Sequence, residues 1–197
     1  MNSNTAITLV GHEGFDEIIL AKTYCDKNGQ FELNYSKNYI GAAKLQIDDS
    51  SSLMLSLNNE NFAIEWSDIK NFETVSFSNS PENKSFEEGM KIYQDVKNKL
   101  VGLKFLLPLY TNEKSKWIQN EISFQENLFD AFLKKLPKKS YASYFLKAKK
   151  LTLEMALATS QPQNISIQEN EFLKLDFDNN YLWNSGLYKE LMNTFSI

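Results

Sequence analysis

The sequence predicts an α+β fold in which an N-terminal antiparallel β-sandwich or partly open barrel is followed by an α-helical bundle. Apolar residues alternate at period two through the first eighty residues, as in strands with one buried face. From residue 81 onward they recur at three- and four-residue steps, as in amphipathic helices. A Ser-Pro-Glu-Asn sequence at residues 80–83 separates the two patterns. We therefore expect an antiparallel β-domain over residues 1–79 and an α-helical domain over residues 80–197.

The β half is predicted to contain seven or eight short strands, spaced roughly ten residues apart. Turn residues mark the reversals between them. Residues 26–29, Asp-Lys-Asn-Gly, are predicted to join a strand that ends near Cys25 to a strand over residues 30–35. Asn58 and Asn59 mark a later turn. The alternating positions are Ile7 and Leu9; Ile18 and Leu20; Phe31, Leu33 and Tyr35; Ala43, Leu45 and Ile47; Leu53, Leu55 and Leu57; Phe62, Ile64 and Trp66; Val75 and Phe77.

The helical half opens with a sequence typical of a helix N-terminus. Ser80 is the expected N-cap, Pro81 the first helical residue, and Glu82 a carboxylate near the positive end of the helix dipole. This helix is predicted to end at Pro108. Further helices are predicted over residues 113–136, 140–158, 169–175 and 182–195, so that four or five helices form a bundle.

The predicted helix over residues 113–136 has a wide apolar surface. Its main stripe is widened by Trp117, Phe124 and Leu128, which predicts that the helix packs on two sides. The main stripe consists of Ile118, Ile122, Phe129, Phe132, Leu133 and Leu136.

The composition excludes several classes of function. The chain has 197 residues and a formal net charge of -4, and all of its 21 basic residues are lysines. Without arginine it has no planar fork for bidentate phosphate binding, so nucleic acid is not an expected partner. With Cys25 as the single cysteine, the chain has no redox pair and no cysteine-rich zinc site. The longest apolar run, residues 100–110, is far shorter than a membrane-spanning helix.

Candidate catalytic and metal-binding residues are few. His12 is the only histidine, and no nucleophile is marked for it. Residues 176–187 begin like a calcium loop but have Tyr181 where that loop needs glycine. Residues 67–70 match Ser-x-x-Lys without its companion motifs. We interpret these residues, and Cys25, as structural, and we predict no catalytic, cofactor-binding or metal-binding residue and no enzymatic activity.

A lysine-rich segment offers a possible surface for an anionic partner. The lysines lie around Tyr141 and Tyr144, and a basic patch with aromatics is typical of sites close to a membrane surface or another anionic surface. The alternative is a solvated helix face opposite an apolar stripe. The lysines are Lys134, Lys135, Lys138, Lys139, Lys147, Lys149 and Lys150.

The order of the turn and strand motifs resembles the N-terminal region of bacterial envelope thiol-disulfide oxidoreductases of the thioredoxin-like, AhpC/TSA-related class. The matching residues are 26–31, Gly41 at the start of a strand, residues 59–64, and residues 80–83 followed by Phe86. The Ser-Pro-Glu-Asn tetrapeptide is the most specific of these. Asn79 departs from the pattern, because glycine is frequent at this position in the family, although asparagine tolerates the same backbone region.

The resemblance implies a non-catalytic N-terminal accessory or interaction module whose redox domain is absent from this chain. That domain would follow Ile197, so no catalytic residue is carried over. The resemblance also implies a place in the periplasm or a tether to the outer membrane. The implied partner is the chain's own missing C-terminal thioredoxin-like domain or another envelope protein, held on exposed sheet edges or in a groove between sheet and helices.

Two alternative functions remain open. In one, the β-sandwich binds a glycan or lipid on aromatic side chains such as Tyr35, Tyr39 and Trp66, and a deep aromatic-lined pocket would favour it. In the other, the chain is a hydrolase built on carboxylates, which requires two buried carboxylates that face each other.

Overall fold

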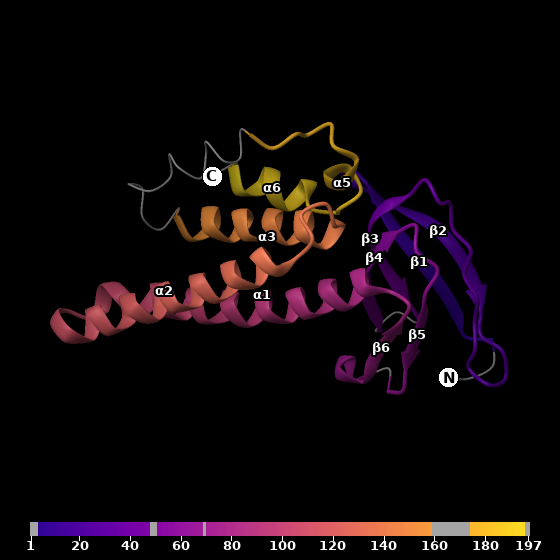
Figure 1. Cartoon of the computed structure of the whole chain (residues 1–197), viewed down its shortest axis with the longest axis horizontal. Coiled ribbons are helices and arrows are strands. Elements are labelled where there is room, and N and C mark those ends of the chain that lie inside the picture. Colours follow the sequence, from indigo (N-terminus) through magenta and orange to yellow (C-terminus); the bar gives the residue numbers. More distant parts are fainter. Residues whose placement is uncertain (1–3, 48–50, 69, 159–173, 196–197) are drawn as a thin grey trace. The chain divides into compact units, whose positions relative to one another are not determined.

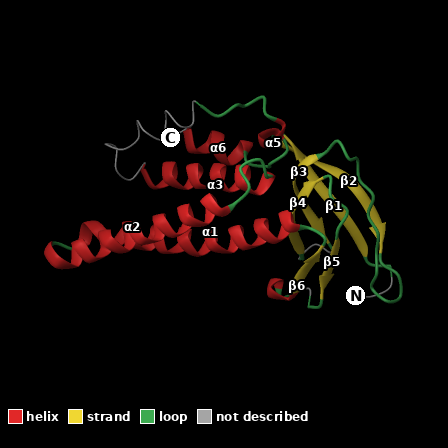
Figure 2. Ribbon diagram, viewed as in Figure 1, coloured by secondary structure: helices red, strands yellow, loops and turns green. Residues whose placement is uncertain are grey.

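The computed structural model describes residues 4–47, 51–68, 70–158 and 174–195 (Figure 1). The predicted α+β class is confirmed (Figure 2). The strands are β1 (Ala6–Glu13), β2 (Asp16–Tyr24), β3 (Ile40–Gln46), β4 (Ser52–Asn58), β5 (Ala63–Trp66) and β6 (Val75–Ser78). The helices are α1 (Pro81–Leu106), α2 (Asn112–Lys135), α3 (Tyr141–Ala158), α5 (Asn180–Trp183) and α6 (Tyr188–Phe195), with 3-10 turns η1 (Phe72–Thr74) and η2 (Leu107–Leu109).

The strands form two antiparallel sheets. The larger sheet has the order β2-β1-β3-β4, and the smaller one consists of β5 and β6. All strand pairs are antiparallel, as predicted. The six strands of the described residues do not close into a barrel. Because β2 and β4 are the outer strands, the larger sheet has two edges at which main-chain groups need other partners.

Residues from both sheets contribute to one hydrophobic core. The alternating positions of β1, β3, β4 and β6 that the sequence marks as buried are buried, which explains the register of these strands. Partly buried side chains from residues 31–35 and from β5 pack against the same core. The buried apolar residues include Ile7, Leu9, Leu45, Ile47, Leu55, Leu57, Val75 and Phe77.

The prediction of a strand over residues 30–35 is wrong. The preceding turn forms, with the Gly29 amide donating to the Asp26 carbonyl (3.0 Å) and Gly29 at a φ of 76°. The following residues still alternate between partly buried and exposed side chains, as in a strand. They have no strand assignment because no neighbouring strand pairs with them. The alternation in the sequence therefore predicted the faces of this segment but not its pairing.

The Ser-Pro-Glu-Asn tetrapeptide opens α1 as predicted. The Ser80 hydroxyl accepts a hydrogen bond from the Asn83 amide (3.1 Å), which satisfies one of the free donors of the first turn. Asn79 has a φ of 61°, the left-handed conformation in which asparagine replaces glycine at low cost. The chain thus turns sharply from β6 into the helix.

Asn83 also binds the outer edge of β4. Its Oδ1 accepts from the Ser56 amide, and its Nδ2 donates to the Ser56 carbonyl, both at 2.8 Å. Nδ2 contacts the Ser80 hydroxyl as well (2.9 Å). Asn83 and Ser56 are both buried. One side-chain amide therefore completes the hydrogen bonds that a further strand would otherwise make at this point of the edge.

The chain divides into two compact units whose bounds differ from those of the predicted domains. One unit contains residues 1–87 together with 176–197, and the other contains residues 88–175. Helices α5 and α6 therefore belong to the unit with the strands, whereas the sequence places them in the bundle. The amide of Ala42 donates to the Asn184 carbonyl (3.0 Å), and Asn184 Nδ2 donates to the Ile40 carbonyl (3.0 Å). These bonds attach the C-terminal segment to β3.

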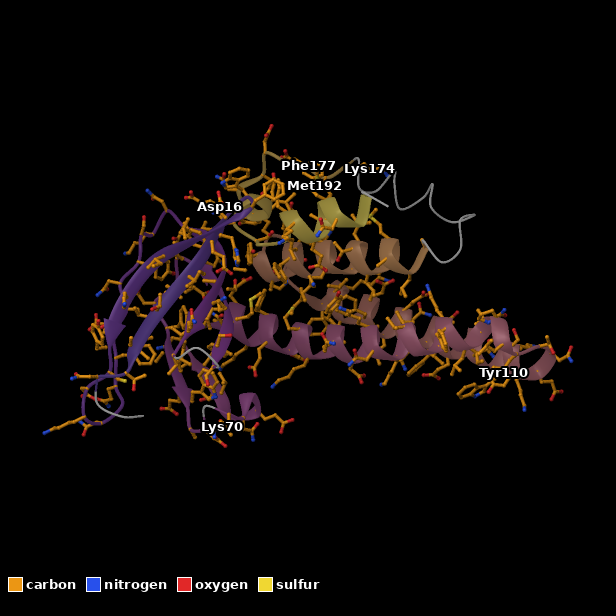
Figure 3. All side chains as sticks on the ribbon, turned by 180° about the vertical axis from the view of Figure 1, so that it is seen from behind. Asp16, Lys70, Tyr110, Lys174, Phe177 and Met192 are labelled. Atoms are coloured by element: carbon orange, nitrogen blue, oxygen red, sulfur yellow. The ribbon has the colours of Figure 1, made fainter. Side chains whose placement is uncertain are left out.

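The predicted helix over residues 182–195 is interrupted. The first short helix ends at Trp183 with Asn184 as its C-cap, and Gly186, at a φ of 72°, lies in the turn before the second helix begins at Tyr188. The Tyr188 ring is surrounded edge-on by Phe15, Phe177 and Trp183, at centroid distances of 5.3 to 6.1 Å. Phe177, which precedes α5, is labelled in Figure 3. The predicted helix over residues 169–175 falls largely on residues 159–173, which lie outside the described ranges.

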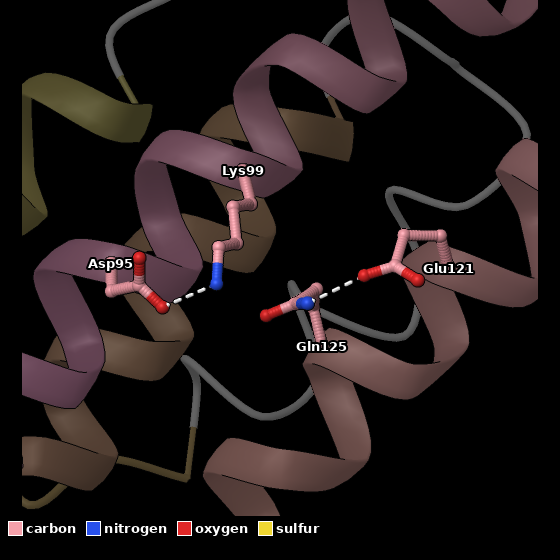
Figure 4. A network of polar contacts seen from close by, with 4 residues as sticks. All are labelled: Asp95, Lys99, Glu121 and Gln125. Carbon is pink, nitrogen blue, oxygen red and sulfur yellow. Dashed lines mark hydrogen bonds and ion pairs between the residues drawn. The ribbon is translucent and has the colours of Figure 1, made fainter.

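The second unit is built from most of α1 together with α2 and α3. The predicted main stripe of α2 is buried, but the prediction that α2 packs on two sides is wrong. Trp117, Phe124 and Leu128 are 63%, 57% and 38% exposed. On the same helix, the buried Gln125 amide donates to Glu121 (2.6 Å), and on α1 Lys99 pairs with Asp95 (Figure 4). A wide apolar stripe predicts an amphipathic helix, but not how many neighbours cover it.

His12 provides a test of how the C-terminal segment is held. Its ring packs on Gly186, where an added Cβ would lie 2.8 Å from the ring. Burial, the largest effect, lowers the pKa of His12 from 6.5; Glu17 raises it and Lys44 lowers it. The folded state therefore binds fewer protons than the unfolded state just below pH 6.5, so stability present above that pH is lost as the pH falls.

We expect His12→Gln to reduce this acid sensitivity. The melting temperature of the unaltered chain should fall between pH 7.5 and pH 5.5, and that of the variant should fall less, because glutamine does not titrate. Differential scanning calorimetry at both pH values measures the two differences. If the melting temperature falls equally in both proteins, protonation of His12 is not the cause of the acid sensitivity.

Candidate functional site

A cavity of about 900 Å³ lies within the first unit, above the inner face of the four-stranded sheet. Its floor is made of side chains that the sheet orients toward the core, and each is at most 3% exposed. The floor residues of β3 and its following residue, and those of β4, are two positions apart, because side chains alternate between the two faces of a strand. The floor residues are Leu9, Leu45, Ile47, Leu55 and Leu57.

Two chain segments form the sides of the cavity. The first wall is residues 29–35, and the second wall is residues 60–67, which include β5. Each wall presents three large apolar side chains at alternate positions, and all six are partly buried. They are Phe31, Leu33 and Tyr35 from the first wall and Phe62, Ile64 and Trp66 from the second.

We infer that both walls contact the cavity through their main chains as well. Every residue of each wall lines it, including Glu32, Asn34, Ala63 and Glu65, whose side chains are exposed. Because side chains of an extended segment alternate between two faces, such residues reach the cavity through their backbone. The cavity therefore extends between the main-chain edges of the two walls.

The main-chain groups at these edges have few partners. Residues 31–35 make no backbone hydrogen bond to any residue that the structure describes. Strand β5 pairs with β6 on one side, and no strand of the described part of the chain pairs with its other side. Residues 31–35 and the side of β5 away from β6 thus resemble sheet edges with which no strand of the described residues pairs.

Glu60 provides a carboxylate at the second wall. The Ser80 hydroxyl, which also caps α1, donates to Glu60 Oε2 (2.7 Å) and fixes this side chain. Burial, followed by the nearby Glu60 charge, raises the pKa of Tyr35 above its usual value of 10. The Tyr35 phenol therefore remains protonated in the neutral pH range and can donate a hydrogen bond.

The three aromatic residues named from the sequence lie in different environments in the structure. Tyr35 and Trp66 line the cavity, on opposite walls. Tyr39 does not: its buried hydroxyl donates to the Ala42 carbonyl and accepts from the His12 amide, both at 2.8 Å. Tyr39 connects β3 with β1, a structural role. The sequence showed the alternation of both walls but gave no signal for the space between them.

The remaining candidates lie apart from the cavity, except Ser67, which lines one end of it. Cys25 is 2% exposed, and its thiol donates to the Thr5 carbonyl (3.4 Å). Asp176 accepts from the Asp178 amide in an exposed turn. Lys70 lies in an exposed loop (Figure 3). In the described ranges, no three His, Cys, Asp or Glu side chains converge as a metal site requires.

Of the two tyrosines in the lysine-rich segment, one is buried and the other is partly buried. Tyr141 is fully buried in the second unit. Lys150 pairs with Asp130 (2.6 Å) and Glu154 (3.1 Å), and Lys149 lies over the Tyr93 ring at 5.0 Å. Of the helices that the structure describes, none is long and apolar enough to cross a membrane.

No family model, no curated protein and no solved structure matches this chain. The resemblance to thioredoxin-like oxidoreductases, and the envelope location that it implies, therefore stay predictions.

Proposed function

We propose that this chain is a non-catalytic binding module that takes up an extended peptide segment of another protein by β-strand addition. The observation that carries this proposal is the cavity above an apolar floor, between two chain segments whose facing edges pair with no strand of the described residues. A peptide placed there would pair with both walls and complete a second layer with β5 and β6. Alternate side chains of the peptide would pack on the floor.

The size of the cavity supports this occupant. A strand rises about 3.3 Å per residue, neighbouring strands lie about 4.8 Å apart, and stacked sheets lie about 10 Å apart. A six-residue strand therefore occupies about 950 Å³, close to the 900 Å³ of the cavity. Residues 31–35 of the first wall can flank five positions of such a strand, and the four residues of β5 can flank four.

The lining favours a peptide over the predicted lipid. A lipid site is mostly apolar around its circumference, with a small number of polar groups. Here both sides include main-chain donors and acceptors, which an acyl chain would leave without partners. An extended peptide satisfies them with its own amides and carbonyls.

The predicted alternative of a carboxylate hydrolase has less support. Among the carboxylates that the structure describes, only Glu82 is buried, and Asn58 Nδ2 donates to it (3.5 Å). The facing pair of buried carboxylates that would favour this alternative does not occur in that part of the chain.

The resemblance described in the sequence analysis supports a proposal for the kind of protein to which this module belongs. We keep the proposal that the module belongs to a thioredoxin-like envelope protein and that its partner is a thioredoxin-like redox domain or another envelope protein. Strand addition is compatible with either partner, because it recognises an extended segment rather than a folded surface.

Tryptophan fluorescence tests the site directly. The full chain is titrated with a soluble six-residue peptide of alternating valine and serine. We expect a saturable change of emission, because Trp66 lines the cavity. The change should be lost in Trp66→Phe and retained in the matched control Trp117→Phe, since Trp117 is exposed on α2 of the other unit. The opposite pattern would place the peptide elsewhere and overturn the proposal.

N-methylated peptides test the hydrogen bonds. Amides of a strand point alternately to its two sides, so methylation of odd or of even positions blocks one edge. We expect either set to weaken binding about tenfold or more, because each set removes several main-chain hydrogen bonds. Binding that is insensitive to both sets would contradict strand addition. Tighter binding of a long-chain fatty acid than of any peptide would favour the lipid alternative instead.

A further inference from the structure

We infer that the added strand is amphipathic with a basic outer face: apolar side chains on the floor of the cavity and lysine or arginine at the outward positions. This inference rests on the proposed function and adds the chemical class of the partner segment. It follows from the charges of the lining residues, which are all of one sign.

Glu32 and Glu65 define the outer face. They belong to opposite walls, and both side chains are exposed between neighbours that point inward. In a sheet, side chains on the same face of adjacent strands lie close together, and opposite charges attract while like charges repel. Outward residues of an added strand would have Glu32 on one side and Glu65 on the other. Basic side chains fit this position and acidic ones do not.

Glu60 extends the negative charge along the second wall. Its carboxylate is held by Ser80 at 2.7 Å and is half-buried, so it has a more fixed position than a surface glutamate. None of the described residues that line the cavity is lysine or histidine. A basic peptide would therefore approach a site without competing cations in its lining, and its association should weaken with salt.

Three peptides of identical valine positions test the inference on the full chain. Their outward positions are lysine, serine or glutamate, and their dissociation constants are measured by fluorescence anisotropy at low salt and at high salt. We expect the lysine peptide to bind about tenfold more tightly than the glutamate peptide at low salt, with the serine peptide between them. The difference should become smaller at high salt, where exposed charges are screened.

Glutamate-to-glutamine variants test which side chains cause the preference for the lysine peptide. The double variant Glu32→Gln with Glu65→Gln should reduce the ratio of the two dissociation constants to about twofold. The matched control Glu73→Gln changes an exposed carboxylate outside the cavity, and it should leave the ratio unchanged. Equal affinity for all three peptides, or an undiminished ratio in the double variant, overturns the basic partner but not strand addition. If none of the peptides binds, the proposed function itself fails.

Discussion

Replacing Asn83 by aspartate is expected to lower the free energy of unfolding by about 3 kcal/mol. The two side chains have nearly the same shape, but a carboxylate cannot donate a hydrogen bond. It would still accept from the Ser56 amide, while its second oxygen would face the Ser56 carbonyl, which now receives a donor at 2.8 Å. Asn83 is only 1% exposed, so water does not compensate.

Urea denaturation of the Asn83→Asp variant at pH 7.5, followed by circular dichroism, measures this loss. The matched control is Asn120→Asp, the same chemical change at an exposed position of α2. The control should change stability by no more than about 0.5 kcal/mol. If the two variants unfold at the same urea concentration, Asn83 does not hold the edge of β4 in the way described.

The second large effect is expected from Gly41→Ala. An added Cβ would lie 2.4 Å from the Asn184 carbonyl oxygen and 2.5 Å from the Asn184 Cβ. The C-terminal segment must then move away from β3 and lose its two hydrogen bonds to Ile40 and Ala42. We expect a loss of about 3 kcal/mol and faster proteolysis within residues 176–195.

Gly102→Ala is the matched control for this substitution. An added Cβ at Gly102, in the exposed part of α1, would meet no atom within 4 Å. Alanine in a helix interior is better than glycine by about 0.5–1 kcal/mol, so the control should be stabilising. The same chemical change is thus expected to have opposite signs at the two glycines. A neutral or stabilising Gly41→Ala would show that α5 does not rest on β3.

Local signals in the sequence predicted the parts of the fold that depend on local chemistry. Ser80 and Pro81 begin α1, and the helix gives way to a 3-10 turn around Pro108, because capping and ring geometry act within one turn. The alternation in β3 and β4 predicted both their faces and their burial.

The remaining errors concern relations between distant segments. Residues 30–35 alternate like a strand, but pairing requires a neighbour that the periodicity of one segment cannot show. The apolar residues Trp117 and Phe124 on α2 remain exposed for a similar reason. The C-terminal helices are amphipathic in sequence, yet the position of Asn184 on β3 depends on the absence of a side chain at Gly41.

The candidate site was predicted only in part for the same reason. The sequence names Tyr35, Tyr39 and Trp66 as aromatics that a glycan- or lipid-binding sandwich would present, and two of them, Tyr35 and Trp66, line the cavity. The cavity is defined by the spacing between two segments that are about thirty residues apart in the chain. Only the three-dimensional structure shows that spacing.

Cys25 gives the native protein a built-in chemical reporter. The thiol lies where β2 ends, hydrogen-bonded to Thr5, and it is the only one in the chain. A thiol reagent can reach it only when this end of the sheet opens, so the rate of modification under native conditions counts local opening events. The rate at which the first strand opens can therefore be measured without an engineered label. A ligand that stabilises this end of the sheet is expected to slow the modification of Cys25.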